Sequence, residues 1–306
     1  MSRRVAGLAL VEREELHGRV RHALVDTSNG VSVDAAALTI DPLELSDGDG
    51  GTLRVDGIGN VFTLEDYRGR GLATQLLEVA IERMRTGGAD GSLLYGIDGF
   101  YEPLGWRSCG DERWVTFEVD RGRAEGEQSP AGSHAVARAM VEDDRAAVRA
   151  LYAGGAARTI GAVVRPDAGA AWSTLDPAEA VVVERDRELV GYAWRGRGTV
   201  SRDIATRDMP GCTAFVELHA TDIDAAWHLV HAARAFASSA GDELAHPRIV
   251  TGAPDGHPLR ELARAGHLDA HLVDVVRPHG GVMLLPFTDA ATAIAADSFQ
   301  FLPDRF

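Results

Sequence analysis

Residues 67–78 read YRGRGLATQLLE and join a strand-like run, IGNVFTL at residues 58–64, to the start of a helix. Apolar residues recur at helical spacing after the second glycine, and Gly87 and Gly88 are expected to end that helix. A glycine-rich turn before a helix lets several backbone N–H groups point at one spot, where the helix also presents its positive end. Two arginines add positive charge within an acidic chain. The turn therefore predicts a binding site for a phosphate or pyrophosphate.

The turn alone does not supply enough free energy for tight binding. The helix dipole contributes about 0.3 to 1 kcal/mol, and each hydrogen bond to a charged group contributes about 1.5 to 3 kcal/mol. Micromolar affinity requires about 8 kcal/mol. We therefore expect other parts of the ligand to be held elsewhere on the chain.

A second motif further along the chain indicates what that ligand is. Residues 99–106, GFYEPLGW, place a tyrosine shortly before a Leu-Gly-aromatic ending. Together with VFTLEDYRGRGLAT at residues 61–74, this motif resembles the Gcn5-related N-acetyltransferase (GNAT) superfamily, whose acetyl-CoA motif has the form R-x-x-G-x-A after a strand. The resemblance covers residues 19–119. The layout of two halves and a tail resembles the tandem Eis-type acetyltransferases, although too few residues follow residue 286 for their sterol-carrier-like domain.

The resemblance implies a reaction and a set of site residues. It implies an acyltransferase that moves an acetyl group from acetyl-CoA, its co-substrate, to a primary amine of a small molecule or peptide by direct attack. Tyr101 would act as general acid and protonate the leaving thiolate. Eis-type enzymes use the terminal carboxylate of the chain as base, which points to Phe306. The residues expected to bind acetyl-CoA are Val61, Phe62 and Thr63 for the pantetheine arm, Arg68, Gly69, Arg70, Gly71, Leu72, Ala73 and Thr74 for the pyrophosphate, and Gly96 and Ile97 for the thioester end.

These residue types suit the chemistry. A tyrosine with a pKa near 10 stays protonated at neutral pH and can donate a proton, and free N–H groups of a strand can polarise the thioester carbonyl. Removing a proton from an amine with a pKa near 10 costs about 4 kcal/mol at pH 7, so a carboxylate should assist. Its identity is open, and the terminal aromatic tail also fits a segment that docks only for packing. The other carboxylates near the motifs are Asp56, Glu65, Asp66, Asp98 and Glu102.

Several features also have simpler interpretations. The two turn arginines fit an ordinary surface turn, and Tyr101 fits a core position. The tetrapeptide RGRG recurs at residues 195–198, but no amphipathic helix follows it, so we expect a loop there. His228 and His231 lie on a predicted helix without an HExxH spacing, which favours a helix surface over a metal site. No metal is expected.

A non-catalytic protein that senses acyl-CoA or serves as a scaffold is the main functional alternative. Acetyltransferases place helices that floor the acceptor pocket early in the domain, whereas residues 1–17 can provide at most one short helix. In the second half the phosphate turn is replaced by TDIDAA at residues 221–226, whose aspartates would repel a phosphate. We therefore expect the second half to bind no CoA. A phosphate-loop kinase is disfavoured because no lysine follows the glycines.

The order of predicted strands and helices in the first half recurs in the second, which indicates an internal duplication. We expect an α/β (α+β) protein of two tandem GNAT-like domains, each a mixed, mostly antiparallel sheet flanked by helices. The last two predicted strands, at residues 271–277 and 281–286, are expected to pair. The expected segments are an acetyl-CoA-binding domain at 1–121, a linker at 122–132, a degenerate domain at 133–286 and a tail at 287–306 that returns toward Tyr101.

Composition limits the class of protein. A chain of 306 residues with 45% hydrophobic content can fill two domain cores. The net charge is −15 and all 31 basic residues are arginines, which argues against a nucleic-acid partner. The apolar runs are too short to span a membrane and the start lacks a signal-peptide core, so we expect a cytoplasmic protein without a membrane partner. Cys109 and Cys212 suit a reducing compartment, and a homo-oligomer is compatible with the sequence.

Overall fold

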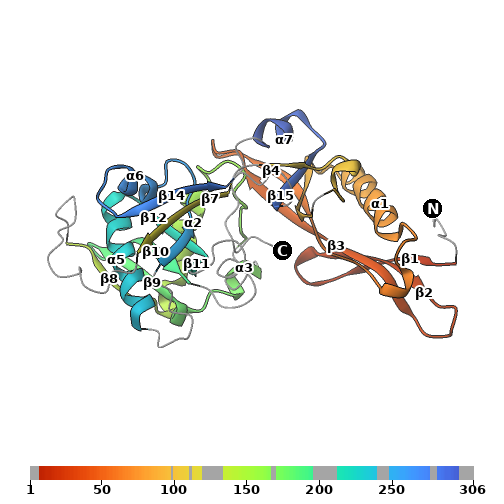
Figure 1. Cartoon of the computed structure of the whole chain (residues 1–306), viewed down its shortest axis with the longest axis horizontal. Helices are drawn as coiled ribbons and strands as arrows, with labels where there is room; N and C mark the ends of the chain where they lie inside the picture. The colour runs from red at the N-terminus through yellow and green to blue at the C-terminus, as the bar shows by residue number, and fades with distance from the viewer. Residues whose placement is uncertain are drawn as a thin grey trace. The chain divides into compact units, whose positions relative to one another are not determined.

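The chain divides into two compact units in a computed structural model of the protein (Figure 1). Unit 1 comprises Met1–Gly110 and Arg277–Ser298, and unit 2 comprises Asp111–Val276. The expected segments 1–121 and 133–286 do not coincide with these units, because each unit takes a strand from beyond the expected boundary. The structure describes residues 7–97, 99–109, 112–118, 134–166, 170–195, 212–239, 248–275 and 281–295.

Unit 1 is built on a seven-stranded sheet in the order β1-β2-β3-β4-β5-β15-β6. Neighbouring strands are antiparallel except β4 and β5, which run parallel. The first strand, β1, was not anticipated by the sequence, and the only helical segment before β2 is the short η1. The strands are β1 (Ala9–Glu14), β2 (Val20–Asp26), β3 (Val33–Ser46), β4 (Thr52–Thr63), β5 (Gly91–Gly96), β6 (Arg107–Ser108) and β15 (Gly281–Pro286).

Helix α1 (Leu72–Thr86) packs on the sheet of unit 1 and confirms the helix expected after the glycine turn. Its buried residues are Leu72, Leu76, Leu77, Ala80 and Met84, which recur at helical spacing and lie in one apolar cluster with the sheet. Burying each large apolar side chain contributes about 1.5 to 3 kcal/mol. The remaining helical segments of unit 1 are short: η1 (Leu16–Gly18), η2 (Glu65–Tyr67), η3 (Glu102–Leu104) and α7 (Asp289–Ile294).

Unit 2 holds two four-stranded sheets, in the orders β12-β10-β9-β8 and β11-β13-β7-β14. Consecutive strands β11 and β12 are separated only by Val216, so one nearly continuous segment pairs with a different neighbour in each half. The strands are β7 (Glu112–Glu118), β8 (Val136–Ala139), β9 (Ala180–Arg185), β10 (Glu188–Trp194), β11 (Cys212–Phe215), β12 (Glu217–Ala220), β13 (Arg248–Gly252) and β14 (Ala270–Val275).

Helices cover both faces of the β12-β10-β9-β8 sheet of unit 2. Helix α2 (Arg145–Ala156) and α3 (Ala170–Ser173) contribute to one apolar cluster, and α5 (Ile223–Ser239) contributes to another. The other helical segments are η4 (Glu142–Asp144), η5 (Pro177–Glu179) and α6 (Pro258–Arg264). Both units therefore have the mixed α/β architecture, with helices flanking mixed sheets, that the sequence predicts. Within the described ranges, no helix is both long and apolar enough to cross a membrane.

The two units have the same strand order, and each takes one strand from a distant part of the sequence. The strand order and directions of unit 1 recur in unit 2, where the segment β11–β12 takes the place of β4. In order across the sheet, β1, β2, β3, β4, β5, β15 and β6 of unit 1 correspond to β8, β9, β10, β11–β12, β13, β7 and β14 of unit 2. Strand β15, which follows unit 2 in the sequence, thus completes unit 1, and β7, which follows unit 1, completes unit 2. We call β7 and β15 the exchanged strands. The expectation that residues 271–277 and 281–286 pair is wrong, because β14 pairs with β7 and β15 pairs with β5 and β6.

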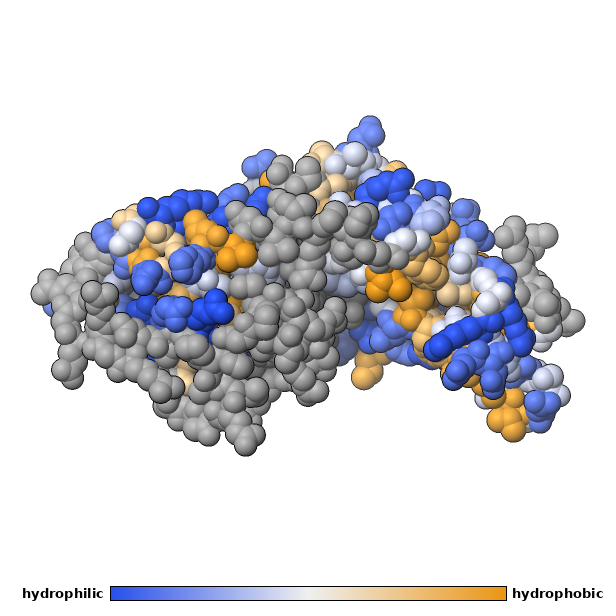
Figure 2. Space-filling view, in the orientation of Figure 1, coloured by the Kyte–Doolittle hydropathy of each residue, from blue (hydrophilic) through white to orange (hydrophobic). Residues whose placement is uncertain are grey.

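The surface of both units mixes hydrophilic and hydrophobic side chains, as Figure 2 shows for one face. Among the described residues, exposed large apolar side chains occur singly, which is normal for a globular protein. Two of them, Leu64 and Ile97, directly follow the neighbouring strands β4 and β5. The exposed large apolar residues are Leu16, Val31, Leu64, Ile97, Val136 and Val141.

Candidate functional site

Strands β4 and β5 separate partway along their length. They pair from Val55 with Gly91 to Ile58 with Leu94, after which β4 continues to Thr63 paired only with β3. A register shift in the β3–β4 pairing accompanies the separation, and Asn60 has a φ of 50° there. The backbone of β4 beyond Ile58 therefore faces β5 without pairing to it. We call this opening the wedge, bordered by residues 59–63 of β4 and residues 95–97.

An exposed backbone edge of this kind suits an extended ligand. A chain with alternating amide donors and acceptors can add to a strand edge as if it were another strand. The predicted pantetheine-binding residues Val61, Phe62 and Thr63 all lie on the wedge side of the separation, at the end of β4. The opposite border carries the predicted thioester residues Gly96 and Ile97, at and just after the end of β5.

The glycine turn leads directly from the end of β4 to α1. Gly69 and Gly71 have φ values of 74° and 70°, a left-handed conformation that favours glycine. Gly71 is the N-cap of α1, and the first intrahelical bond runs from the Gln75 N–H to its carbonyl at 3.1 Å. The N–H groups of Leu72, Ala73 and Thr74 precede that bond, so the helix itself offers them no acceptor. This geometry is compatible with the anion site that the sequence predicts.

The two turn arginines are held by the local backbone. Arg68 donates to the Thr63 carbonyl at 3.3 Å, and Arg70 donates to the Asp66 carbonyl at 2.9 Å. Arg70 also lies 5.0 Å from the ring centre of Tyr67. Both side chains are exposed, and neither forms an ion pair within the part of the chain that the structure describes. Their positive charge therefore remains available to an anion at the turn.

Tyr101 lies shortly after β5 and is only 8% exposed. Its ring packs edge-on against Phe100 at 4.9 Å and against Trp106 at 6.0 Å, in the apolar cluster that contains α1. Burial raises the pKa of its hydroxyl. The group therefore stays protonated at neutral pH, as a proton donor requires. The core position considered for Tyr101 and the role of proton donor are thus compatible.

The candidate carboxylates occupy different places. Asp56 is buried in the paired half of β4, opposite Ser92 of β5, and burial raises the pKa of its carboxyl. Glu65 and Asp66 are exposed on η2, beside the glycine turn. Glu102 begins η3 directly after Tyr101. Asp98 and Phe306 lie outside the described residues, as do most residues of the second RGRG tetrapeptide.

The described part of the tail contacts the other end of β5. Phe287 and Thr288 donate backbone hydrogen bonds to the Asp90 carbonyl, at 2.8 Å and 3.1 Å, just before β5 begins. Helix α7 follows, and Ala291 lies close to Gly91. The wedge opens where β5 ends, so residues 287–295 are not positioned at the wedge.

In unit 2, side chains of the chain itself occupy the start of α5, the position that corresponds to the glycine turn. The Ala225 N–H at the start of α5 donates to a carboxylate oxygen of Asp222 at 2.9 Å. Arg185 in turn donates to Asp222 at 2.6 Å and lies 3.4 Å from Asp224. A carboxylate of the chain itself therefore caps this helix, where an external anion would otherwise bind.

Buried polar side chains also fill the region where β12 leaves β13 in unit 2. Arg165 donates to Glu217 at 2.7 Å, and both side chains are almost completely buried. The Tyr192 hydroxyl donates to the same carboxylate. The guanidinium of Arg165 lies 3.7 Å from the ring centre of Tyr152. His219 stacks on Tyr192 with ring centres 5.2 Å apart, and burial lowers its pKa to about 3.

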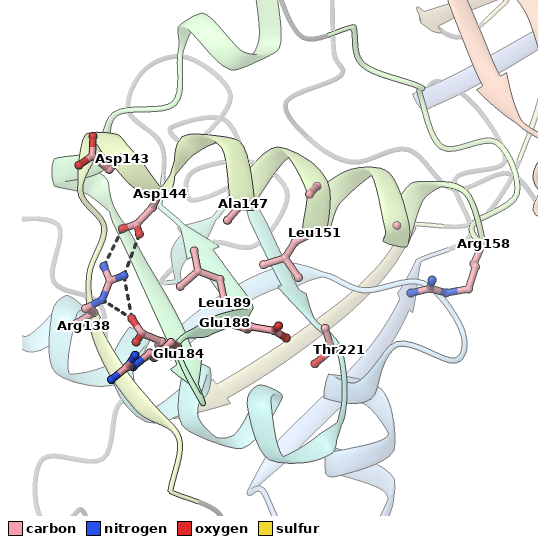
Figure 3. A pocket seen from close by; sticks show the side chains of 13 residues that line it. Arg138, Asp143, Asp144, Ala147, Leu151, Arg158, Glu184, Glu188, Leu189 and Thr221 are labelled. Carbon is pink, nitrogen blue, oxygen red and sulfur yellow. Dashed lines mark hydrogen bonds and ion pairs between the residues drawn. The ribbon is translucent and has the colours of Figure 1, made fainter.

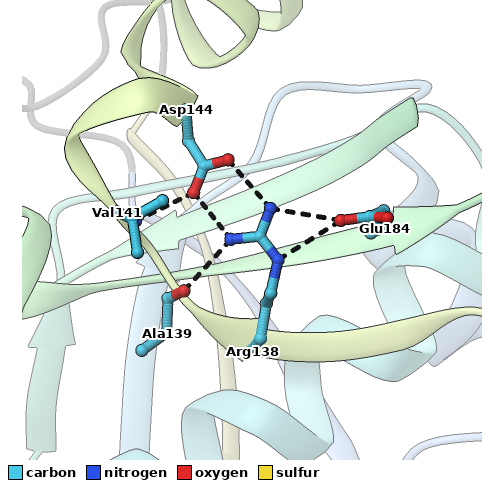
Figure 4. A network of polar contacts seen from close by, with 5 residues as sticks. All are labelled: Arg138, Ala139, Val141, Asp144 and Glu184. Atoms are coloured by element: carbon cyan, nitrogen blue, oxygen red, sulfur yellow. Dashed lines mark hydrogen bonds and ion pairs between the residues drawn. The ribbon is translucent and has the colours of Figure 1, made fainter. Parts of the chain in front are cut away.

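An open pocket of about 620 Å³ lies along α2 in unit 2 (Figure 3). Leu151 and Leu189 face it from α2 and β10, and Arg158 lies at one end. At the other end Arg138 donates to Asp144 at 2.7 Å and to Glu184 at 3.1 Å, while Asp144 also accepts from the Val141 N–H (Figure 4). This network ties the start of α2 to β8 and β9. It pairs the Arg138 guanidinium with two carboxylates, which is a structural role.

The sequence did not indicate that β15 borders the site. Its residue Met283 pairs with Leu94 of β5, and a Cβ atom added to Gly96 would overlap the Met283 sulfur. The only local signal is a glycine at the end of an apolar strand, which is compatible with many structures.

Comparisons with known proteins agree with this geometry. Residues 35–109 match the family model described as an acetyltransferase (GNAT) domain. A comparison with curated protein sequences finds no match. Similar solved structures include a GCN5-related N-acetyltransferase from Kribbella flavida, with 22% identity, a TM-score of 0.58, and coverage of 91% of this chain and 62% of that one. Another, from Anabaena variabilis, has 17% identity, a TM-score of 0.63, and coverage of 90% and 65%.

Eis1 from Mycobacterium abscessus is also similar, with 15% identity, a TM-score of 0.55, and coverage of 87% of this chain and 64% of Eis1. At these identities the likeness concerns the fold. The chain spans less than two thirds of the length of each of these three proteins. The family match spans most of β3, then β4, the glycine turn, α1, β5 and Tyr101, and it includes both borders of the wedge. The family predicted from the motif pair is thereby confirmed for residues 35–109, which match a GNAT acetyltransferase domain.

Proposed function

We propose that unit 1 binds acetyl-CoA and transfers its acetyl group to a primary amine of a small molecule or peptide. The observation that carries the proposal is the combination, within one compact unit, of the wedge between β4 and β5, a left-handed glycine turn and a buried tyrosine. Each part alone has other uses. Together they offer a slot for an extended arm, a site for its pyrophosphate and a proton donor near the strand end.

The ligand would be held at three places. Its pantetheine arm would add to the free edge of β4 at Val61, Phe62 and Thr63, as a peptide adds to a sheet edge. Its pyrophosphate would accept hydrogen bonds from the amides of residues 69–74, with Arg68 and Arg70 contributing charge. Several hydrogen bonds of about 1.5 to 3 kcal/mol each, together with the strand contacts, are sufficient for micromolar binding.

The reaction requires a proton donor, an oxyanion site and a base. The thioester would lie beside Gly96 and Ile97, where a free strand amide can stabilise the tetrahedral oxyanion. As the carbon–sulfur bond breaks, the Tyr101 hydroxyl would protonate the thiolate. The attacking amine must lose a proton, and we propose the terminal carboxylate of Phe306 as the base, with Asp56, Glu65, Asp66, Asp98 and Glu102 as alternatives.

We further propose that unit 2 is a degenerate GNAT-like domain that binds no CoA, in a tandem arrangement similar to that of Eis proteins. Its strand order supports a common origin with unit 1. Its helix α5 is capped by Asp222 and Arg185 rather than by an open glycine turn. The Arg165–Glu217 pair is buried where an arm would have to enter.

Calorimetry with acetyl-CoA tests the binding proposal. The intact chain should bind acetyl-CoA, and Gly71→Glu should abolish binding because a carboxylate then faces the pyrophosphate. Gly266→Glu is the matched control, since Gly266 is also an exposed glycine with a positive φ, but lies in unit 2. Absence of binding to the intact chain, or an equal loss in both variants, would contradict the proposal.

A second function, a non-catalytic sensor of acyl-CoA, is favoured by one observation. Unit 1 has only η1 (Leu16–Gly18) between β1 and β2, whereas unit 2 has α2 and α3 between the corresponding strands. Tyr101→Phe separates the two functions when CoA release is followed colorimetrically with a panel of amines. An enzyme should lose turnover and keep its affinity for CoA. A sensor has no turnover to lose.

A further inference from the structure

We propose that Met283, on the exchanged strand β15, closes the acyl end of the wedge and limits the transferred group to acetyl. This inference rests on the proposed function of unit 1. It assigns the selectivity for acyl length to a residue that lies 187 positions after Gly96 in the sequence. Nothing in the two sequence motifs includes this residue.

The pairing of β15 places Met283 at the border of the wedge. Met283 pairs with Leu94 of β5, which is also the last β5 residue that pairs with β4. The next two residues, Tyr95 and Gly96, pair with β15 on one side, and β4 has already separated on the other. The end of β5 is therefore a single strand between the wedge and β15.

Gly96 allows the methionine side chain to lie across that strand. A Cβ atom at position 96 would overlap the Met283 sulfur and would lie 3.1 Å from its Cγ atom. Met283 is completely buried and belongs to the apolar cluster that also contains Leu94 and Tyr101. The methionine thus occupies the space that the missing side chain of Gly96 leaves, on the face of the sheet that carries the proposed proton donor.

A methionine in this place sets a length limit by filling space. An acetyl group beside Gly96 would end against the thioether, and each added methylene would require the side chain to move. Methionine is flexible, so the limit is a graded one rather than a rigid wall. Discrimination by a pocket of this kind amounts to roughly 10- to 200-fold for one methylene. Removing the side chain beyond Cβ opens room for a longer acyl chain.

The test compares acyl-CoA selectivity in the full-length chain. We would measure kcat/KM for acetyl-, propionyl- and butyryl-CoA with a fixed amine acceptor. Met283→Ala should raise the ratio of butyryl-CoA to acetyl-CoA activity by about 10-fold or more. Met283→Leu, which keeps the volume, should leave the ratio close to that of the wild type. If the alanine variant does not fold, Met283→Val gives the same comparison with a residue that suits a strand.

Met84→Ala is the matched control. Met84 is a buried methionine of the same apolar cluster, but it lies near the end of α1, away from the wedge. Its loss should lower stability and leave the selectivity ratio unchanged. An unchanged ratio in the smaller Met283 variants, or an equal change in Met84→Ala, would overturn the inference.

The experiment distinguishes failure of this inference from failure of the proposed function. If the chain binds acyl-CoA without turnover, the proposed reaction is wrong, and the ratio of butyryl-CoA to acetyl-CoA affinity then takes the place of the rate ratio. A shift of that affinity ratio in Met283→Ala alone would still support the role of Met283. Absence of binding of any of the three acyl-CoA molecules would overturn both.

Discussion

Replacing Leu284 by alanine should destabilise unit 1, although Leu284 follows the whole of unit 2 in the sequence. Leu284 lies on β15, is 1% exposed, and pairs with Leu93 of β5 and Arg107 of β6. A buried Leu→Ala substitution costs about 2 to 5 kcal/mol. Because each 1.36 kcal/mol changes an equilibrium constant tenfold, the equilibrium constant for unfolding of unit 1 should rise by roughly 30- to 5,000-fold. Unit 2 should be affected little.

The reciprocal variant is Phe117→Ala. Phe117 lies on β7, is 1% exposed, and pairs with Ile249 of β13 and Ala270 of β14 in unit 2. Its loss should cost about 3 to 5 kcal/mol and destabilise unit 2. The two variants serve as controls for each other, because each removes a buried side chain from one exchanged strand.

Hydrogen exchange followed by mass spectrometry on the full-length chain reads out both units at once. For Leu284→Ala, exchange should accelerate in peptides from β2, β3 and β4, and remain near wild type in peptides from β9, β10 and α5. Phe117→Ala should give the opposite pattern. If the acceleration instead follows the order of the sequence, with Leu284→Ala opening unit 2, the exchange of strands deduced from the pairing is incorrect.

Three further predictions concern unit 2. Burial lowers the pKa of His219 from its ordinary 6.5 to about 3. The contribution of the neutral imidazole to stability is therefore complete above pH 6.5 and falls by about 1.4 kcal/mol per pH unit as the pH drops toward 3. Between pH 8 and 4 the melting temperature of His219→Gln should depend less steeply on pH than that of the wild type, and equal slopes would contradict this. Arg165→Met leaves the buried Glu217 carboxylate without its ion pair and should lower the free energy of unfolding, measured by chemical denaturation, by about 3 to 5 kcal/mol. Adding Glu217→Gln should restore part of that loss. An equal or larger loss in the double variant would argue against the buried pair. Asp222→Ala removes the cap of α5 and should lower the free energy of unfolding by about 0.5 to 2 kcal/mol, and an unchanged melting curve would show that the cap is unimportant.

The parts of the molecule that the sequence predicted are those in which neighbouring residues determine the geometry. The turn at Gly69 and Gly71 needs left-handed backbone, which glycine adopts freely, and α1 follows from the spacing of its own apolar residues. Both lie within a short segment. The motif pair was therefore sufficient to identify the family. At residues 221–226 the sequence indicated aspartates in place of a glycine turn, but only the structure shows that Asp222 caps the helix there.

The parts that only the tertiary structure decided depend on which distant segments pair. Strands β14 and β15 are both short apolar runs separated by few residues, and a hairpin between them was the natural interpretation of the sequence. A strand carries no local record of its partner, because its backbone can pair with any free edge and its alternating side chains suit many sheets. Only the completed sheets select β7 for unit 2 and β15 for unit 1. The position of Met283 over Gly96 follows from that selection, so no reading of either segment alone could have placed it there.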